Sequence, residues 1–578
     1  MHKSKGSQRA SAIAFILSAV LVAGGCSSTP AATPAPAASG AQAASQPTAA
    51  SPSGAVPSSA AFSATQDAVA GGAATIGVPA GGIDHLEPTL WWYAVTWGIA
   101  YATCTPLVTF PDLAGQPGSA VIAGLADLPT ISADAKTYTF KLRSGIKFAD
   151  GTPITGAAIA YTWQRMLAPA LASPAGGFFS DVVGAADYSA GKTTTIPGIT
   201  VAGDSIAFTL NQPSGSFLER MTMPFTCPVP IGTPITAIED GSILETGPYL
   251  VKTYTPNREL VLARNPNYNA AVLGNRGKLD TITLQLNVDP AQAGLQIRAG
   301  QLATYLDKMA PADATQALAD STLVGRVFAG TLPSTTYVWF NTTVAPFDNV
   351  KVRQAVNFAL NREEILRVWG GPSQGVITDQ VLPPTMPGWQ QANLFPPAGD
   401  TAKAQSLLQE SGVQLPISTV LWSSAAGLQI AQAVQAQLKA VGINAEIKSG
   451  TDAVLSATIM TVANKAPMGI NIWTQDYPDP DDFFGPLLDG NRITPTNNSN
   501  FGSFNDPAVN AAIEAMGPVT GADRAAKWNQ LDQQVIGQDA AWAPLLNASR
   551  VTLLAKNTCG YVFHPVYVLD LTTLGNCQ

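Results

Sequence analysis

The chain has 578 residues, which at roughly 150 residues per domain allows three or four folded units. Its formal net charge is −8 and no basic patch is apparent, so nucleic acid is not an expected partner. Charged residues make up only 12% of the chain and hydrophobic residues 46%, a balance that still allows a well-packed globular protein.

The first 25 residues have the pattern of a targeting segment. Lys3, Lys5 and Arg9 form a basic start, and Ser11–Val22 is an apolar stretch too short for a comfortable membrane span. The small residues before Cys26 resemble a bacterial lipoprotein signal, which predicts cleavage after residue 25 and a lipid on Cys26. An ordinary secretory peptide or an uncleaved anchor is the alternative.

Residues 26–71 consist almost entirely of Ala, Ser, Pro, Gly, Thr and Gln, without periodicity. Such a segment cannot bury a core, and we interpret it as a flexible tether between the membrane and the folded body. Regular structure is expected to begin near Ala74–Val78, a short run of β-type residues.

Five cysteines fit an oxidising compartment. With Cys26 lipidated, four remain, and four cysteines allow three pairings. Cys559 and Cys577 both lie in the C-terminal tail, which favours a local bridge and leaves Cys104 to pair with Cys227. Free buried thiols are the alternative.

Strand and helix patterns alternate through the first half of the folded body. Apolar and polar side chains alternate over Tyr138–Leu142, which predicts a strand. Thr155–Leu167 is predicted to be a helix with Thr155 as its N-cap, because apolar residues recur there at helical spacing. Further strands are expected at Ser205–Leu210, Leu250–Lys252, Glu259–Arg264 and Thr281–Leu286, and a helix at Ala291–Gly300.

A second α/β section is expected from Tyr337 onward. Strands are predicted at Val338–Asn341, Ser418–Trp422, Ile443–Lys448, Met468–Trp473 and Ala541–Leu546. Helices are predicted at Val350–Trp369, Thr401–Ser411, Leu428–Val441, 452–463 and Asp523–Ile536, with Arg353, Arg362 and Arg367 on the surface of the first. The strand–helix–strand order between residues 418 and 448 predicts a right-handed parallel unit.

The stretch Asn471–Leu487 ends a buried strand and continues into a loop with four aspartates and two prolines. A strand that delivers an acid beside an aromatic residue into a rigid loop suits ligand recognition. The alternative is an ordinary strand-to-helix turn, in which Asp481 and Asp482 cap a helix that begins near Phe483.

Six segments together resemble one protein family. Tyr138–Leu167 is similar to the signature of family 5 extracellular solute-binding proteins, the peptide/nickel-type binding components of ABC transporters. The other segments that agree, in the same order, are Thr246–Tyr268, Asn341–Arg362, Leu382–Pro384, Ile430–Ile443 and Trp473–Phe484. The resemblance spans about residues 72–578.

The resemblance implies an α/β fold of the two-lobed periplasmic-binding-protein type II class, with an extra domain inserted in lobe I. Lobe I would comprise residues 72–332, with the insertion at about 110–245, and lobe II residues 333–544. Residues 545–578 would return to lobe I, and the crossovers would lie near Gly330–Thr336 and Ala541–Leu546. A Cys104–Cys227 bridge would then staple the insertion to lobe I.

The resemblance also implies ligand contacts in a cleft that closes by hinge motion. In peptide-binding members, the acid of the pattern that begins at Trp473 pairs with the peptide ammonium, which assigns that role to Asp476. Five further contacts are expected, for each of which core packing is an alternative: Trp473, Trp422, Gly82, Ile83, and an aromatic from the insertion at Phe178 or Phe179.

Two departures from the family pattern bear on the ligand. Dipeptide-specific members carry an arginine after the strand that matches Ser418–Trp422, whereas the loop Ser423–Gly427 has no basic residue. We therefore expect longer or differently charged ligands rather than dipeptides. Only three histidines are present, and His85 and His564 are too few and too separate for a direct metal site, so no metal or cofactor is expected.

We therefore expect a monomeric, lipid-anchored peptide-binding component of an ABC importer on the extracytoplasmic face of the membrane, with permease subunits as partners. The alternative keeps the fold but changes the ligand to a sugar, a metal chelate or another small solute. An enzyme is not expected. Gly371–Gly375 matches a G-x-S-x-G nucleophile pattern around Ser373, but it follows a helix and lacks evident Asp and His partners.

Overall fold

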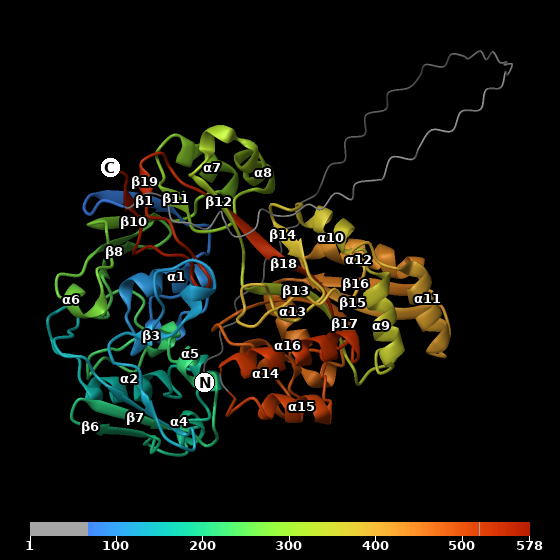
Figure 1. Ribbon diagram of the computed structural model, residues 1–578, viewed down its shortest axis with the longest axis horizontal. Coiled ribbons are helices and arrows are strands. Elements are labelled where there is room, and N and C mark those ends of the chain that lie inside the picture. The colour runs from blue at the N-terminus through green and yellow to red at the C-terminus, as the bar shows by residue number, and fades with distance from the viewer. Residues whose placement is uncertain (1–67, 520) are drawn as a thin grey trace, which may run out of the picture. The chain divides into compact units, whose positions relative to one another are not determined.

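The computed structural model describes residues 68–519 and 521–578, and in this part of the chain two larger β-sheets pack with helices (Figure 1). The strands of the first are β1 (Ala73–Gly77), β8 (Tyr249–Thr255), β9 (Glu259–Arg264), β10 (Thr281–Gln285) and β11 (Thr304–Tyr305). Their order is β11-β1-β10-β9-β8, with β1 parallel to both its neighbours and β10, β9 and β8 antiparallel. Along β10, every second side chain is buried, and Ile282 and Leu284 belong to the core cluster of this sheet.

A four-stranded antiparallel sheet lies between β1 and β8 in the chain. Its strands, in the order β4-β5-β7-β6, are β4 (Thr130–Ile131), β5 (Thr137–Lys141), β6 (Ile199–Ala202) and β7 (Ser205–Thr209). Helix α2 (Gly156–Met166) packs on it and begins where Thr155 Oγ1 accepts a hydrogen bond from the Ala158 N–H at 3.2 Å. Ile159 and Trp163 are buried, as their helical spacing predicts.

The second larger sheet contains seven strands, all from the second half of the chain. They are β12 (Val327–Thr331), β13 (Ser334–Phe340), β14 (Gly375–Ile377), β15 (Ile417–Ser424), β16 (Ile443–Gly450), β17 (Met468–Thr474) and β18 (Trp542–Leu553). Six follow the order β12-β18-β13-β17-β15-β16, and β14 pairs with β18. β15 and β16 are parallel over eight residue pairs, which confirms the predicted parallel unit.

Alternation along β13 separates two cores on the two faces of this sheet. Val338 and Phe340 belong to one cluster, whereas Tyr337 and Trp339 belong to the other. The helices with residues in the first cluster are α9 (Val350–Ala359), α10 (Arg362–Trp369), α11 (Thr401–Glu410) and α12 (Leu428–Ala440). Those with residues in the second are α13 (Asp452–Ile459), α14 (Asp481–Leu488), α15 (Pro507–Glu514) and α16 (Gly521–Gly537).

The prediction of one helix over residues 350–369 was wrong, because α9 and α10 are separate. The backbone leaves the helical region at Leu360, and Asn361 starts α10 by accepting a hydrogen bond from the Glu364 N–H at 2.9 Å. Arg353 and Arg362 are buried, contrary to expectation. The guanidinium of each donates to backbone carbonyl oxygens, which satisfies its N–H groups. Arg367 is exposed and pairs with Glu364.

Two backbone segments connect β12 to the rest of the second sheet. β12 and β13 are separated only by Leu332 and Pro333. β18 runs as one buried strand that pairs with β13 through Trp542–Leu546 and with β12 through Ser549–Leu553 (Figure 1). The described residues belong to one compact unit, so the lobe boundaries at residues 332 and 544 stay a prediction.

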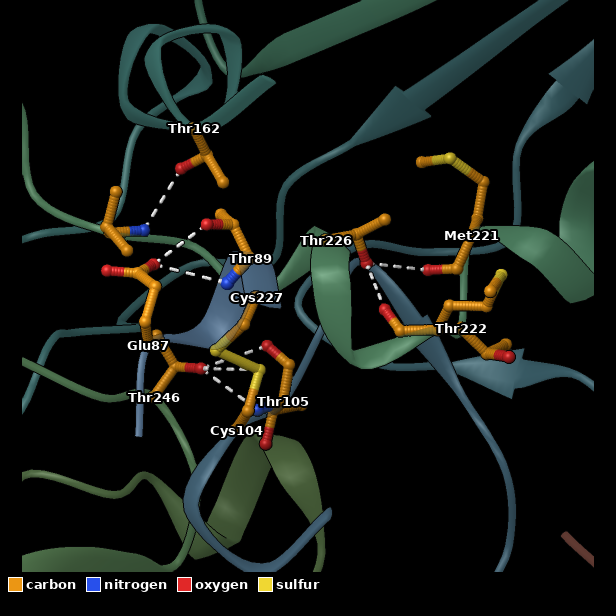
Figure 2. The surroundings of a disulfide bond; sticks show 12 residues. Glu87, Thr89, Cys104, Thr105, Thr162, Met221, Thr222, Thr226, Cys227 and Thr246 are labelled. Carbon is orange, nitrogen blue, oxygen red and sulfur yellow. Dashed lines mark hydrogen bonds between the residues drawn. A yellow bond between two sulfur atoms is a disulfide. The ribbon is translucent and has the colours of Figure 1, made fainter. Parts of the chain in front are cut away.

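Two disulfides are present in the part of the chain that the structure describes, with the pairing expected from the sequence. Cys104, which ends α1 (Ala94–Thr103), is bonded to Cys227, and Cys559 is bonded to Cys577. Beside the first bridge, the Thr105 N–H donates to Thr246 Oγ1 at 2.9 Å, and Thr246 Oγ1 donates to the Thr105 carbonyl oxygen (Figure 2). Three chain segments are thus held together at this point.

The remaining helices precede β12 in the chain, and none is longer than nine residues. They are α3 (Ala175–Phe178), α4 (Ala185–Ser189), α5 (Phe217–Arg220), α6 (Ala270–Leu273), α7 (Pro290–Arg298) and α8 (Pro311–Ala319). Within the described residues, no helix is both long and apolar enough to cross a membrane. The expected signal segment, Cys26 and most of the expected tether, up to residue 67, lie outside the described residues.

Candidate ligand-binding site

Asp476 lies two residues beyond the end of β17 and carries an acid group that bears on ligand binding. Its backbone N–H donates to Asp482 Oδ2 at 2.8 Å, which fixes the loop that follows the strand. Its Oδ2 atom is buried and has no hydrogen-bond partner among the described residues. Burial raises the pKa of Asp476 to about 7. A cation brought by a ligand would satisfy this oxygen and favour the ionised carboxylate.

Asp479 also holds the loop in place, through an ion pair with Arg524. Arg524 donates to Asp479 through Nε (2.9 Å) and Nη2 (2.7 Å), and both side chains are nearly buried. Asp479 Oδ1 also accepts the Asp481 N–H at 2.9 Å, at the start of α14. The prediction that Asp481 and Asp482 cap a helix near Phe483 was therefore wrong, because both lie in its first turn.

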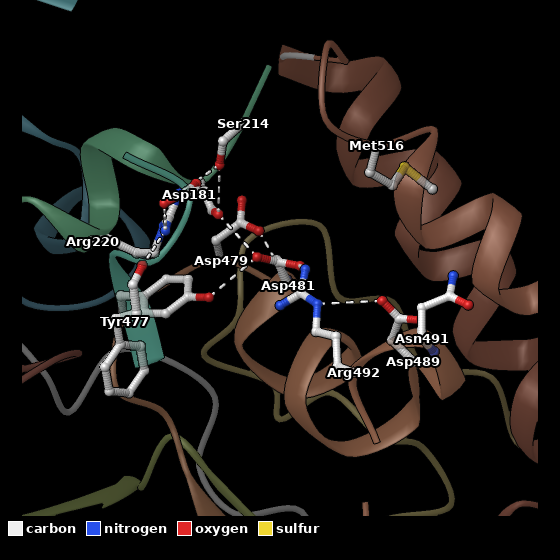
Figure 3. Close-up of polar contacts among 12 residues, drawn as sticks. Asp181, Ser214, Arg220, Tyr477, Asp479, Asp481, Asp489, Asn491, Arg492 and Met516 are labelled. Carbon is white, nitrogen blue, oxygen red and sulfur yellow. Dashed lines mark hydrogen bonds and ion pairs between the residues drawn. The ribbon is translucent and has the colours of Figure 1, made fainter. Parts of the chain in front are cut away.

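Asp481 instead connects the loop to the segment that precedes α5 (Figure 3). Ser216 Oγ donates to Asp481 Oδ2 at 3.0 Å, Tyr477 Oη donates to the same atom at 3.3 Å, and Arg492 Nη2 lies 3.3 Å from Oδ1. Burial raises the pKa of Asp481, but the nearby Arg492 and Arg220 outweigh it and the pKa lies below its usual range. Asp481 is thus an ionised link between two distant parts of the chain.

Aromatic side chains from the insertion meet the same loop. Tyr477 belongs to the buried cluster of the four-stranded sheet and lies edge-on to Phe178, with ring centroids 6.3 Å apart. Phe178 is half-buried and also stacks on Phe225. Phe179 is fully buried against Trp163, so in this structure it is a core residue. Of the two expected aromatics, the structure brings only Phe178 to the acidic loop.

The other expected contact residues lie in different parts of the structure. Trp473 and Trp422 are half-buried against the core cluster that contains Trp339. Gly82 is buried in a turn in which its N–H donates to the Pro79 carbonyl oxygen, and Ile83 packs against the core of the first sheet. Their roles in ligand binding stay predictions.

Two features were missed from the sequence. A cavity of about 430 Å³ lies at the carboxyl ends of β15 and β17, with Trp369, Ile430 and Phe501 in its lining. Lys308 Nζ lies 5.1 Å from the ring centroid of Trp369 and has no ion pair within residues 68–519 and 521–578. Burial lowers the pKa of Lys308, partly offset by Asp307. Neither feature has a local sequence signal, because each depends on segments far apart in the chain.

Ser373 and His564, which the sequence analysis considered for catalysis and metal binding, make other contacts in the structure. Ser373 Oγ lies 3.2 Å from Thr315 Oγ1, with no histidine bonded to it. His564 is buried, burial lowers its pKa to about 3, and its ring accepts backbone N–H groups of Val566 and Tyr567. The described residues contain no cluster of three His, Cys, Asp or Glu side chains placed to hold a metal ion.

Comparison with known proteins identifies the family. Residues 120–495 match the family model for bacterial extracellular solute-binding proteins, family 5 middle region. The chain belongs to this family. The glutathione-binding protein GsiB of Escherichia coli K12 is 27% identical over 464 residues, which cover 76% of this chain and 83% of that protein.

Solved structures of solute-binding proteins share the fold of this family 5 chain. The clavulanic acid biosynthesis oligopeptide binding protein 2 superimposes with a TM-score of 0.82 at 24% identity, covering 89% of this chain and 99% of that chain. OppA of Haemophilus influenzae, in complex with the peptide RPPGFSPFR, gives a TM-score of 0.66 at 22% identity, covering 87% of this chain and 99% of that chain. The expected two-lobed type II fold is confirmed by these neighbours.

Proposed function

We propose that this protein is the peptide-binding component of an ABC importer, anchored by a lipid on Cys26 at the extracytoplasmic face of the membrane. The observation that carries the peptide assignment is the buried, unpartnered Oδ2 of Asp476. A peptide N-terminus is a cation, and enclosing it requires an anionic partner that is not already neutralised by the protein. As a monomer, the protein would bind one ligand and present it to permease subunits.

The surroundings of Asp476 support capture by closure. Asp476 follows a loop residue, Gln475, whose N–H donates to the Pro333 carbonyl oxygen at 2.8 Å, within the short β12–β13 connection. A hinge is commonly made of a few residues at the ends of such elements. The ammonium site therefore lies next to the backbone that would bend. Trp473 would pack beside the first peptide residue, and Gly82 and Ile83 would meet the peptide backbone.

Lys308 is our candidate for the residue that pairs with the C-terminal carboxylate of the peptide. It is half-buried, has no ion pair among the described residues, and lies beside Trp369. A buried ammonium gains more from a carboxylate partner than one in water, since water no longer screens it. This would replace the arginine that the loop Ser423–Gly427 lacks.

The first experiment identifies the natural ligand. The purified full-length protein is extracted with organic solvent, and the extract is analysed by mass spectrometry for co-purified peptides. Short peptides with a free or an acetylated N-terminus, and with a free or an amidated C-terminus, are then compared by thermal shift and calorimetry. Equal stabilisation by free and acetylated peptides would contradict the role of Asp476, and equal stabilisation by free and amidated peptides that of Lys308.

A substitution tests the ammonium pairing directly. Asp476→Asn is expected to weaken binding of a free peptide by about 2–5 kcal/mol, because it removes the charge while the ligand cation remains enclosed. It should leave binding of the acetylated peptide nearly unchanged. Asp523→Asn, at an exposed position in the first turn of α16, is the matched control and should not alter either affinity.

A non-peptide solute is the second candidate, and one observation favours it. The cavity at the ends of β15 and β17 has no charged residue in its lining, and the adjoining loop has no basic residue. A sugar, a metal chelate or another small molecule in the extract, together with no peptide, would support this candidate.

A further inference from the structure

Two parallel strands of the second sheet, β15 and β17, diverge just before the acidic loop that follows β17. β15 and β17 are paired only at Leu421–Met468 and Trp422–Gly469. Beyond these pairs, β15 continues along β16 to Ser424, whereas β17 continues along β13 to Thr474. The cavity of about 430 Å³ lies at this divergence. In open α/β sheets, such a crevice at the carboxyl ends of strands is where ligands bind.

The chemistry of the lining selects an uncharged group. Ile430, Leu455, Ile459 and Phe501 contribute apolar surface, and no lining residue carries a charge. Lys308 contacts the ring of Trp369 but is not part of the lining. A cavity of this size is within the roughly 300–1,000 Å³ typical of small-ligand sites. An apolar group that enters it would be removed from water without leaving an ion unpaired.

A buried hydroxyl inside the cavity points to an occupant. Thr336 is 3% exposed, lines the cavity, and its Oγ1 has no hydrogen-bond partner in the described part of the chain. Opposite Thr336 on β17 is Ile472, which is 42% exposed and also lines the cavity. An unpaired polar atom beside an exposed apolar side chain is the pattern of a site that a ligand completes.

We infer that this crevice, lined by Thr336, Ile430, Leu455, Ile459, Ile472 and Phe501, is an apolar side-chain subsite that makes the protein selective for short peptides with an apolar residue. The inference rests on the proposed peptide binding at Asp476. Ile472 and Asp476 are four residues apart, so their Cα atoms are separated by at most about 14 Å. An apolar residue within the first four positions of an extended peptide would therefore reach the crevice while its ammonium contacts Asp476.

The test uses a plug at the mouth of the crevice. Ala426 lines the cavity, whereas its neighbour Ala425 does not, and both alanines are exposed. Ala426→Trp should obstruct the crevice without disturbing the fold, and Ala425→Trp is the matched control. The ligands are trialanine and tetra-alanine peptides in which one alanine at a time is replaced by Phe, Tyr, Asp or Lys. Their dissociation constants are measured by calorimetry with the full-length protein.

At one peptide position, Phe is expected to bind at least about tenfold more tightly than Ala, and more tightly than Asp or Lys. Ala426→Trp should reduce this preference to about twofold or less, whereas Ala425→Trp should retain it. Thr336→Val, which replaces the hydroxyl by a methyl group of similar size, should keep the preference for Phe but lower the gain from a Tyr at the same position. A preference for Phe that survives Ala426→Trp would overturn the subsite and leave the proposed function intact.

A second measurement separates the subsite from peptide binding. An anilinonaphthalene dye reports occupation of an apolar cavity by its fluorescence, whether or not peptides bind. Failure of all peptides to bind would overturn the proposed function. In that case, dye binding lost in Ala426→Trp and kept in Ala425→Trp would still support the apolar crevice. Dye binding that is equal in the wild-type protein and in both variants would overturn it.

Discussion

A carboxylate that is buried without a partner carries a free-energy cost, which the protein can lower by binding a proton. Asp476 illustrates this, because burial raises its pKa to about 7. In the empty protein, the folded state therefore holds a proton that the unfolded chain releases near pH 4. Between about pH 4 and pH 7, this residue makes stability fall as the pH rises. Ligand binding uses the same group in the opposite sense, because a cation prefers the ionised form.

The affinity for a peptide with a free N-terminus should consequently depend on pH. Below about pH 7, affinity should fall by about tenfold per pH unit, because Asp476 must first lose its proton. Above about pH 8, it should fall again, because the peptide amine loses its own charge. Calorimetric titrations from pH 5.5 to 8.5 check this, and Asp476→Asn should abolish the decline on the acid side. A flat profile between pH 5.5 and 7 would contradict the pairing.

At the scale of elements, the acidic loop is rigid because its side chains are bonded on both sides. Asp479 ties the loop to Arg524 on α16, and Asp481 ties it to Ser216. Glu219, on the neighbouring α5, is half-buried, and burial of its carboxyl group together with Asp479 raises its pKa to about 8. The loop that presents Asp476 is therefore positioned by the Arg524 ion pair and by the hydrogen bond from Ser216, in addition to its own two prolines.

Removal of one partner of the Asp479–Arg524 pair should be costly. Asp479→Asn is expected to lower the free energy of unfolding by about 3–5 kcal/mol, because Arg524 would stay buried without a countercharge. Denaturant unfolding measures this loss. Asp187→Asn, which breaks the exposed pair with Lys192, should cost less than about 1 kcal/mol. Equal losses in the two variants would show that the loop pair is not a structural anchor.

The sequence predicted most elements, since their patterns are local. Tyr138–Leu142, Thr281–Leu286 and Met468–Trp473 show an alternation of period two or an apolar run that the structure reproduces as β5, β10 and β17. The family resemblance pointed to Asp476 but could not reveal that its Oδ2 lacks a partner. That depends on where Arg524 and Arg492 point, and both are engaged by Asp479 and Asp481.

Other features were beyond prediction because they depend on contacts between distant segments. The crevice requires the registers of β15 and β17, whose paired residues Leu421 and Met468 are far apart in the chain. The break between α9 and α10 depends on buried partners of Arg362, such as the Pro544 carbonyl oxygen. A helical apolar pattern alone does not record such interactions.

At the scale of the whole molecule, the two disulfides constrain very different lengths of chain. Cys104–Cys227 closes a loop with a sequence separation of 123 residues, whereas Cys559–Cys577 has a separation of 18. A cross-link stabilises the folded state mainly by restricting the unfolded chain, and the effect grows with loop length. The longer loop contains the four-stranded sheet, so its bridge limits the freedom of the insertion in the unfolded state.

Replacing each cysteine pair by serine should therefore have unequal effects. Loss of Cys104–Cys227 is expected to cost about 5 kcal/mol and loss of Cys559–Cys577 about 3 kcal/mol, as the loop-closure entropy predicts. Denaturant unfolding of the two double variants gives the comparison, with the wild-type protein under reducing conditions as the reference for loss of both. A larger cost for the shorter loop would show that local packing, rather than chain entropy, dominates.

β18 is one uninterrupted strand that pairs with β13 along its first part and with β12 along its last part. Asn547, at its middle, donates through Nδ2 to the Ser334 carbonyl oxygen and to Thr335 Oγ1, each at 3.0 Å, and so clamps the second connection beside the first. In the proposed closure, two connections held side by side would favour rotation about one shared axis over sliding. A permease subunit that contacts the outer surface would then distinguish the ligand-bound protein from the empty protein by one angle, the angle between the two lobes.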